Sequence, residues 1–239
     1  TLAAVADPVP GAAERLASQL GAAKFYTDPQ TLLNDPAIDA VAIVSPARTH
    51  AELVVAAAKA GKHVFCEKPM AVTLEEADRA IAAAKGAGVV LQVGFNRRYV
   101  SGFSAAYDEI IAGKIGTPQL LRSTTRDPGL NDPSRIPHWT IFLETLIHDF
   151  DILLHLNPGA KPVSVYAVAD ALVRPDFKEQ GLLDTAVVNI RFDNGAIATA
   201  SANFHAVYGY DVRADVFGSQ GMLPAGNINI NNCVRYTSA

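Results

Sequence analysis

A glutamate–lysine pair directly follows a short apolar segment in the first half of the chain. Residues His63–Cys66 have the character of a buried strand, bounded by Gly61 and Pro69. Glu67 and Lys68 would then lie at the carboxyl end of that strand, the edge at which open α/β sheets bind ligands. A lysine amine there can stabilise negative charge on a substrate oxygen. The alternative, a solvated loop lysine, is common for a lysine considered alone.

A stripe of acids and histidines is predicted on one apolar helix, residues 141–156. At about 100° per residue, its polar side chains fall on one narrow face, which consists of Glu144, His148, Asp151 and His155. A helix this apolar is buried, so the stripe either faces solvent or lines a cleft. No lysine or arginine shares the stripe, which favours catalytic chemistry. A carboxylate one turn before a histidine can orient its ring, so His148 is the candidate general base for a hydroxyl proton.

These side chains need a scaffold, and the first half of the chain alternates strands with helices. We expect strands at residues 2–6, 40–44, 63–66 and 89–93, and helices at residues 10–20 and 50–60. Gly21 should end the first helix, and Thr73 with Glu76 forms a capping box that opens a third. Continuous apolar strands between helices predict a parallel sheet covered on both faces.

The second half is dominated by alternating segments. We expect a helix near residues 104–112 and strands at residues 119–126, 163–173, 185–192, 196–204 and 211–217. Asp193-Asn194-Gly195 is a strong hairpin signal between two of these strands. With the helix at residues 141–156 among them, the strands predict a separate α+β domain with a mostly antiparallel sheet, beginning near Gly94.

Composition narrows the class of protein. The chain has 239 residues, 49% hydrophobic and 18% charged, which suffices for one large domain or two small ones. A net charge of −4 without a basic stripe argues against a nucleic-acid partner. Cys66 and Cys233 lack metal-type spacing, so we expect no metal site and a reducing compartment. No apolar run is long enough to span a bilayer and no signal peptide is visible, so we expect a cytoplasmic protein without a membrane partner.

The remaining polar candidates each have an ordinary structural explanation. Asp7 can be a plain loop acid, and Ser45-Pro46 before His50 can be a turn and a helix cap. Arg97-Arg98 can be a solvated pair. The sequence opens inside a strand, and no G-x-G-x-x-G motif occurs in it. We therefore expect the natural protein to supply a glycine-rich turn and a central strand ahead of Thr1.

Several short motifs occur in order: Ala6-Asp7, Ser45-Pro46 through His50, Glu67-Lys68-Pro69, Gly94-Phe95-Asn96-Arg97-Arg98 and Ile147-His148-Asp149-Phe150-Asp151. Together they resemble the Gfo/Idh/MocA family of NAD(P)-dependent sugar and polyol dehydrogenases. Two more motifs, Arg126-Asp127-Pro128-Gly129 and Val207-Tyr208-Gly209-Tyr210-Asp211, are most similar to the inositol 2-dehydrogenase branch. The resemblance covers nearly the whole chain, and the set is specific although each motif alone is weak.

The resemblance implies two domains. Residues 1–95 would form a dinucleotide-binding Rossmann domain, incomplete at its N-terminus. Residues 96–239 would form a domain for substrate and oligomer contacts, incomplete at its C-terminus. A homo-oligomer, dimer or tetramer, is expected because open sheets in this family usually pair.

The resemblance also implies roles for single residues. Lys68 corresponds to the active-site lysine and His148 to the proton acceptor. Glu144 stands where the family usually has an aspartate, four residues before the histidine. Asp7 matches the acid that holds the adenosine ribose, which favours NAD over NADP because a 2′-phosphate would meet a like charge. The other implied cofactor-binding residues are Ser45, Pro46, His50, Glu67, Lys68 and Asn96, and the implied substrate-binding residues are Arg98, Asp127, Asp151 and Tyr210.

Two departures from the family pattern stand near the implied site. Glu144 is one methylene longer than aspartate, which shifts its reach toward His148 or a substrate hydroxyl. Pro137-His138-Trp139-Thr140 replaces a typical Ser-Gly-Gly, and a bulky Trp139 can reshape the pocket.

The sequence thus predicts an oxidoreductase that transfers a hydride between NAD and a secondary hydroxyl of a cyclic polyol or sugar, with an inositol as the first choice. Two alternatives stay open. One is a non-catalytic NAD-binding regulatory protein on the same fold. The other is a dehydrogenase of a non-polyol, such as a dihydrodiol or an amino sugar.

Overall fold

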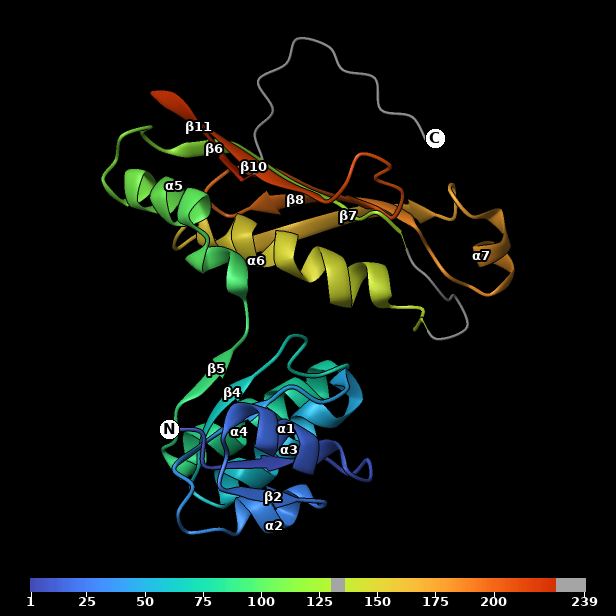
Figure 1. Cartoon of the computed structure of the whole chain (residues 1–239). Helices are drawn as coiled ribbons and strands as arrows, with labels where there is room; N and C mark the ends of the chain where they lie inside the picture. The colour runs from blue at the N-terminus through green and yellow to red at the C-terminus, as the bar shows by residue number, and fades with distance from the viewer. Residues whose placement is uncertain (130–135, 227–239) are drawn as a thin grey trace. The chain divides into compact units, whose positions relative to one another are not determined.

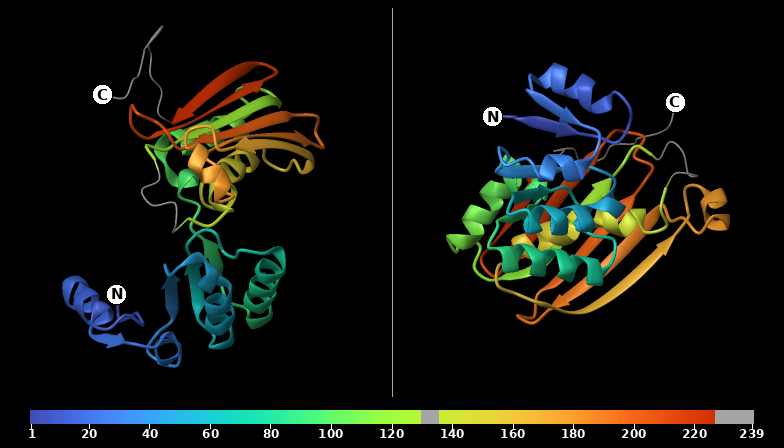
Figure 2. Two further views of the ribbon diagram at one scale, coloured as in Figure 1. Left: turned by 90° about the vertical axis from the view of Figure 1, so that its right-hand side faces the viewer. Right: turned by 90° about the horizontal axis from the view of Figure 1, so that it is seen from below.

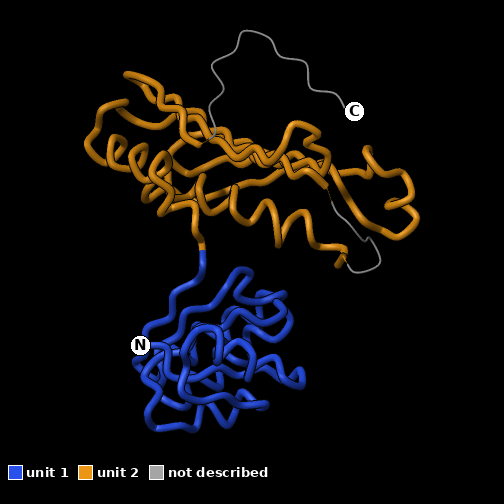
Figure 3. The backbone as a smooth tube through the Cα atoms, in the orientation of Figure 1, with its two compact units in different colours: residues 1–94 blue, residues 95–239 orange. Residues whose placement is uncertain are grey.

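The chain divides into two compact units, residues 1–94 and 95–239 (Figure 3). The computed structural model describes residues 1–129 and 136–226. The first unit carries parallel strands alternating with helices, and the second carries a mostly antiparallel sheet with helices (Figure 1). The predicted fold class is confirmed.

Five short strands of the first unit are arranged in two parallel sheets. β1 (Ala4–Ala6) pairs with β2 (Lys24–Tyr26), and β3 (Ala40–Ile43), β4 (His63–Cys66) and β5 (Leu91–Val93) form the order β3-β4-β5. The helices between them are α1 (Ala12–Leu20), α2 (Pro29–Leu33), α3 (His50–Lys59) and α4 (Leu74–Ala87).

Local signals explain where these helices begin and end. Gly21 ends α1 with a φ of 71°, a left-handed conformation that glycine adopts without strain, and its N–H bonds the Ala17 carbonyl. Thr73 and Glu76 form both halves of the predicted capping box at the start of α4. The core between α3 and the sheet consists of apolar side chains, among them Val54 and Ala57 of α3 and Val64 of β4.

The second unit begins with a 3-10 turn, η2 (Asn96–Tyr99), and α5 (Ser101–Ile111). Its six-stranded sheet has the order β11-β10-β6-β9-β8-β7, with β6 and β9 parallel and the other neighbours antiparallel. The strands are β6 (Pro118–Arg126), β7 (Pro162–Asp170), β8 (Thr185–Phe192), β9 (Ile197–Asn203), β10 (Asp211–Gly218) and β11 (Gly221–Gly226). The predicted hairpin joins β8 to β9, and Gly195 takes the required positive φ of 89°.

Helices α5 and α6 (Ile147–His155) lie along one face of this sheet (Figure 2). On that face β9 presents only alanines, Ala198, Ala200 and Ala202, all fully buried in the core that contains Ile152 and Leu153 of α6. We call these three residues the alanine floor. Methyl side chains let a helix lie close to the sheet, so the floor fixes how near α6 can come.

The opposite face of the sheet, which we call the open sheet face, carries exposed apolar side chains. Tyr166 and Val168 of β7 are 68% and 55% exposed, and their cross-strand neighbours on β8 are Asn189 and Val187. Ile197 of β9 is 53% exposed. Exposed apolar side chains gathered on one sheet face mark an interaction surface more often than plain solvent-exposed surface.

Three expectations were wrong in detail. Residues 141–156 are not one α-helix, because Thr140–Leu146 is π-helical and α6 begins only at Ile147. The strand expected at residues 163–173 ends at Asp170. Six short elements were missed, namely β2, α2, β11, α7 (Pro175–Glu179) and the two 3-10 turns η1 (Ala47–Thr49) and η2. Segments this short carry too few residues for a hydrophobic period to be seen.

Candidate functional site

In the first unit, several predicted site residues lie at the carboxyl ends of strands. Asp7 follows β1, and its Oδ1 accepts a hydrogen bond of 2.8 Å from the N–H of Val9. Ser45-Pro46 follows β3, and Glu67-Lys68-Pro69 follows β4. Because β3 and β4 are parallel neighbours, with Ile43 opposite Cys66, these two turns lie at the same sheet edge. That edge is where α/β sheets bind ligands.

Contacts between side chains and backbone groups hold the two turns in place. Glu67 is half-buried, and its Oε2 accepts a 3.2 Å hydrogen bond from the N–H of Lys68. His50 is the first residue of α3 and only 2% exposed. Its Nδ1 lies 2.7 Å from the Pro69 carbonyl oxygen, and its Nε2 lies 2.7 Å from the Ser45 carbonyl oxygen. The His50 side chain is therefore buried between the two turns, and both of its ring nitrogens face backbone carbonyl oxygens.

Cys66, the residue before Glu67, is fully buried, and burial raises the pKa of its thiol to about 12, with the charge of Glu67 adding to the effect. An unfolded chain loses this proton near pH 9, whereas the folded chain keeps it. The unfolded state then binds fewer protons, so stability falls as pH rises from about 9 to about 12.

We therefore expect the stability advantage of the wild type over Cys66→Ala to shrink above pH 9, by at most about 1.4 kcal/mol per pH unit. Urea unfolding at a series of alkaline pH values, in a Cys233→Ser background, measures this difference. A constant difference between the two proteins across that range contradicts the prediction.

In the second unit, His148 lies in the first turn of α6, directly after the π-helical segment that carries Glu144. Both side chains are half-buried. The Phe95 ring lies edge-on to the His148 ring, with the ring centroids 6.5 Å apart. A π-helical turn is wider than an α-turn, so the predicted spacing of about 100° per residue holds from His148 onward but not for Glu144. Such segments are frequent at functional sites.

A buried polar cluster lies next to His148. Asp149 is fully buried, and its carboxylate accepts hydrogen bonds from Arg97 (3.1 Å), Ser123 (2.5 Å) and Thr125 (2.8 Å). Arg97 also donates to the Thr125 hydroxyl at 2.6 Å. Burial raises the pKa of the Asp149 carboxyl, and the Arg97 charge opposes that shift. The expectation of a solvated arginine pair was wrong for Arg97, which is 5% exposed.

The rest of the predicted stripe makes contacts within the second unit. Arg98 forms a forked ion pair with Asp151, through 3.1 and 2.9 Å bonds from Nε and a shorter bond from Nη2. The Asp151 carboxylate raises the pKa of Arg98. The His155 ring stacks on Tyr107 at 4.0 Å, and burial, followed by the charge of Arg98, lowers the pKa of His155. His155 is thus a packing residue, and two predicted substrate ligands bind each other.

The other predicted residues of the second unit lie in exposed or half-exposed turns. Asn96 opens η2 and is exposed. Asp127 follows β6, and its Oδ1 accepts from the N–H of Gly129 at 3.1 Å. Tyr210 is 55% exposed just before β10.

Sequence reasoning missed Asp149, Ser123 and Thr125 as parts of the site. A signal for Asp149 was present, because an aspartate next to the candidate base in a helix this apolar needs a partner. The partners themselves lie 24 to 52 residues away in the chain, a separation at which no sequence pattern pairs them.

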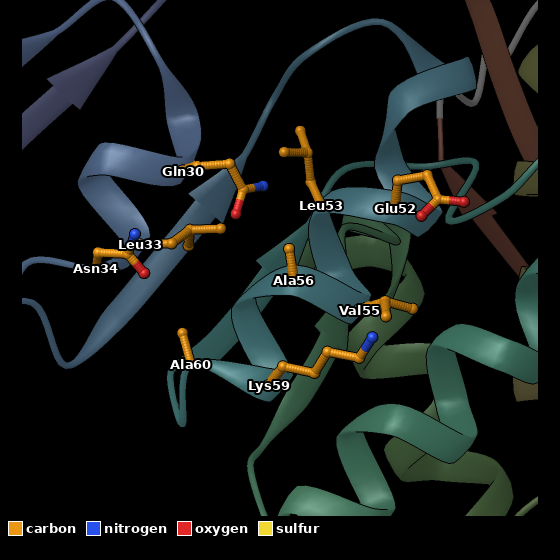
Figure 4. Close-up of a pocket in the computed structure, with 9 residues that line it drawn as sticks. All are labelled: Gln30, Leu33, Asn34, Glu52, Leu53, Val55, Ala56, Lys59 and Ala60. Atoms are coloured by element: carbon orange, nitrogen blue, oxygen red, sulfur yellow. The ribbon is translucent and has the colours of Figure 1, made fainter.

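A hollow of about 450 Å³ lies between α2 and α3, lined in part by Leu33, Leu53 and Ala56 (Figure 4). None of the predicted site residues lines it.

Across residues 1–129 and 136–226, His, Cys, Asp and Glu side chains nowhere gather in a group suited to a metal ion. Over the same residues, each helix is too short or too polar to cross a membrane.

Comparison with known families gives two matches. Residues 1–95 match the model described as "Oxidoreductase family, NAD-binding Rossmann fold". Residues 103–224 match the model of the "GFO/IDH/MocA C-terminal domain". The two matches together cover nearly all of the described chain.

Individual proteins are similar over most of this chain. An uncharacterized oxidoreductase, YrbE, of Bacillus subtilis is 44% identical over 84% of the chain and 59% of its own length. A myo-inositol 2-dehydrogenase of Thermotoga maritima is 42% identical over 95% of the chain and 68% of its own length. The crystal structure of a scyllo-inositol dehydrogenase from Lactobacillus casei, with bound NAD(H) and scyllo-inositol, is 29% identical, with a TM-score of 0.89 over 98% of this chain and 71% of that one. The chain thus spans about three fifths to two thirds of the length of these curated relatives.

Proposed function

Because this chain belongs to the GFO/IDH/MocA family of oxidoreductases, we propose that it is an NAD-dependent dehydrogenase of a cyclic polyol or sugar, with an inositol as the leading substrate. The observation that carries the proposal is the similarity of both halves of the chain to inositol 2-dehydrogenases, 42% identical for one of them. The reaction is transfer of a hydride between NAD and a secondary hydroxyl-bearing carbon.

The first unit fits a dinucleotide. Asp7 stands at the carboxyl end of β1, where an acid can hold the hydroxyls of an adenosine ribose and disfavour a 2′-phosphate. Ser45, Pro46 and Glu67 stand at the neighbouring strand ends of β3 and β4. We assign dinucleotide binding to residues 1–95, with Asn96 as an additional contact. NAD, when bound, supplies the hydride acceptor.

The proposed chemistry uses one base and one cation. His148 takes the proton from the substrate hydroxyl through its imidazole, and the neighbouring Glu144 orients the ring or a substrate hydroxyl. Lys68 holds the same oxygen and stabilises the negative charge that develops on it as the proton leaves. The hydride then leaves the carbon that bears this oxygen.

We assign substrate binding and self-association to residues 96–239. Arg98, Asp127, Asp151 and Tyr210 are the proposed substrate ligands. Since Arg98 and Asp151 already form a forked pair, we propose that they present a preformed array of donors and acceptors to ring hydroxyls.

The exposed apolar side chains of the open sheet face support a homo-oligomer, a dimer or tetramer. We further propose a cytoplasmic location, which the buried free thiol of Cys66 supports.

A substrate panel tests the function. The full-length protein is mixed with NAD and with individual inositols and aldoses, and absorbance at the nicotinamide band is followed. We expect reduction of NAD with at least one inositol isomer. NAD binding without any absorbance change would instead favour a non-catalytic regulatory protein. Activity found only when dihydrodiols or amino sugars are added to the panel would replace the inositol assignment.

A further inference from the structure

The ring of His50 lies between two backbone carbonyl groups. Its Nδ1 is 2.7 Å from the Pro69 oxygen and its Nε2 is 2.7 Å from the Ser45 oxygen. The side chain is 2% exposed, so bulk water does not replace either contact. Both neighbours are carbonyl oxygens, which accept hydrogen bonds and donate none.

Hydrogen bonds to both carbonyl oxygens need two donors on one ring. A neutral imidazole carries one N–H, and its second nitrogen is an acceptor whose lone pair would then face a carbonyl oxygen at hydrogen-bond distance. That arrangement is repulsive. A ring protonated on both nitrogens donates to both carbonyls, and such charge-assisted bonds are about twice as strong as neutral ones, which opposes the cost of burying the charge.

The two carbonyls belong to the two turns that follow β3 and β4. We propose that His50 is a buried imidazolium that ties the Ser45-Pro46 turn to the Glu67-Lys68-Pro69 turn, and that it acts as a positioning residue for Lys68. The Pro69 carbonyl is one residue from Lys68, so a fixed Pro69 fixes the backbone from which the lysine extends. The positioning role rests on the proposed function, whereas the charge on the ring does not.

Nitrogen NMR tests the charge directly. The full-length protein, with ¹⁵N-labelled histidine and no NAD or substrate, is examined at neutral pH. The signals of its six histidines are assigned through bonds, with His50→Gln as a check on the assignment. We expect both ring nitrogens of His50 to carry hydrogen. An unprotonated ring nitrogen at His50 would overturn the proposal, whether or not the protein is a dehydrogenase.

Kinetics test the positioning role. His50→Gln keeps one donor and loses the other, so we expect kcat to fall about tenfold, the worth of one charged hydrogen bond, with the KM for the polyol little changed. In a Lys68→Arg background the lysine amine is already absent, so the same substitution at His50 should have a much smaller effect on kcat. His205→Gln, at an exposed position, is the matched control and should leave kcat unchanged.

Two kinetic outcomes overturn the positioning role. One is an unchanged kcat in His50→Gln accompanied by a lower melting temperature, which is the behaviour of a merely structural residue. The other is equal and independent losses of kcat in the wild-type and Lys68→Arg backgrounds.

Discussion

Replacing His148 or Lys68 by alanine in the full-length protein is expected to lower turnover by about 10²- to 10⁴-fold, the range associated with a lost general base or acid. NAD should still bind, because neither substitution removes Asp7 or the β3 turn. The His148 variant loses the proton acceptor. The Lys68 variant loses the positive charge that stabilises the substrate oxygen. Steady-state rates on the best substrate of the panel, with NAD affinity measured in parallel, test both.

Matched controls separate this effect from general damage. Lys85→Ala removes an exposed lysine of α4, and His205→Ala removes an exposed histidine of the second unit. Both controls should keep wild-type rates. Wild-type rates in His148→Ala and Lys68→Ala themselves would refute the proposed chemistry.

The second large effect is on stability. Asp149→Asn or Arg97→Leu should each lower the free energy of unfolding of the second unit by about 3–5 kcal/mol, because each leaves one buried charge without its partner. Asp149 is fully buried and Arg97 is 5% exposed, so solvent cannot replace the lost ion pair. Urea unfolding followed by the fluorescence of Trp139, the single tryptophan, reports on this unit.

The double variant Arg97→Leu/Asp149→Leu tests the explanation. It buries no unpaired charge, so it should recover part of the loss seen in either single variant. Asp176→Asn breaks an ion pair with Arg174 at the surface, where the side chain of Arg174 is 46% exposed and that of Asp176 is 50% exposed. This substitution should change the free energy of unfolding little. Single variants as stable as the wild type would show that the cluster contributes no net stability.

Some features of this protein depend only on residues that are close together in the sequence, and these were predicted. The capping box of Thr73 and Glu76 is one, because both halves of the motif lie within one helical turn. The β8–β9 hairpin is another, because Asp193-Asn194-Gly195 determines the local turn. The placement of Glu67-Lys68 after β4 followed from an apolar run that ends at a proline.

Other features depend on partners that are distant in the chain. Arg97 and Arg98 are adjacent in the sequence, yet one is buried against Asp149 and the other pairs with Asp151 near the surface. Nothing in the local pattern distinguishes them. The π-helical segment was also beyond prediction, because its sequence keeps the apolar spacing of an ordinary helix. The exposure of β7 depends on its place at the sheet edge, which only the strand order reveals.

The alanine floor has a consequence for how this protein can change. Ala198, Ala200 and Ala202 contact neither cofactor nor polyol in the proposed function, yet they lie beneath α6, the helix that carries His148 in its first turn. Each added methylene at these positions must push α6 outward or force strained side chains, at a typical cost of about 1–3 kcal/mol. The alanine floor therefore sets the height of α6 above the sheet, and with it the position of the proposed proton acceptor His148. Mutations that adjust substrate preference without touching a substrate ligand should concentrate there.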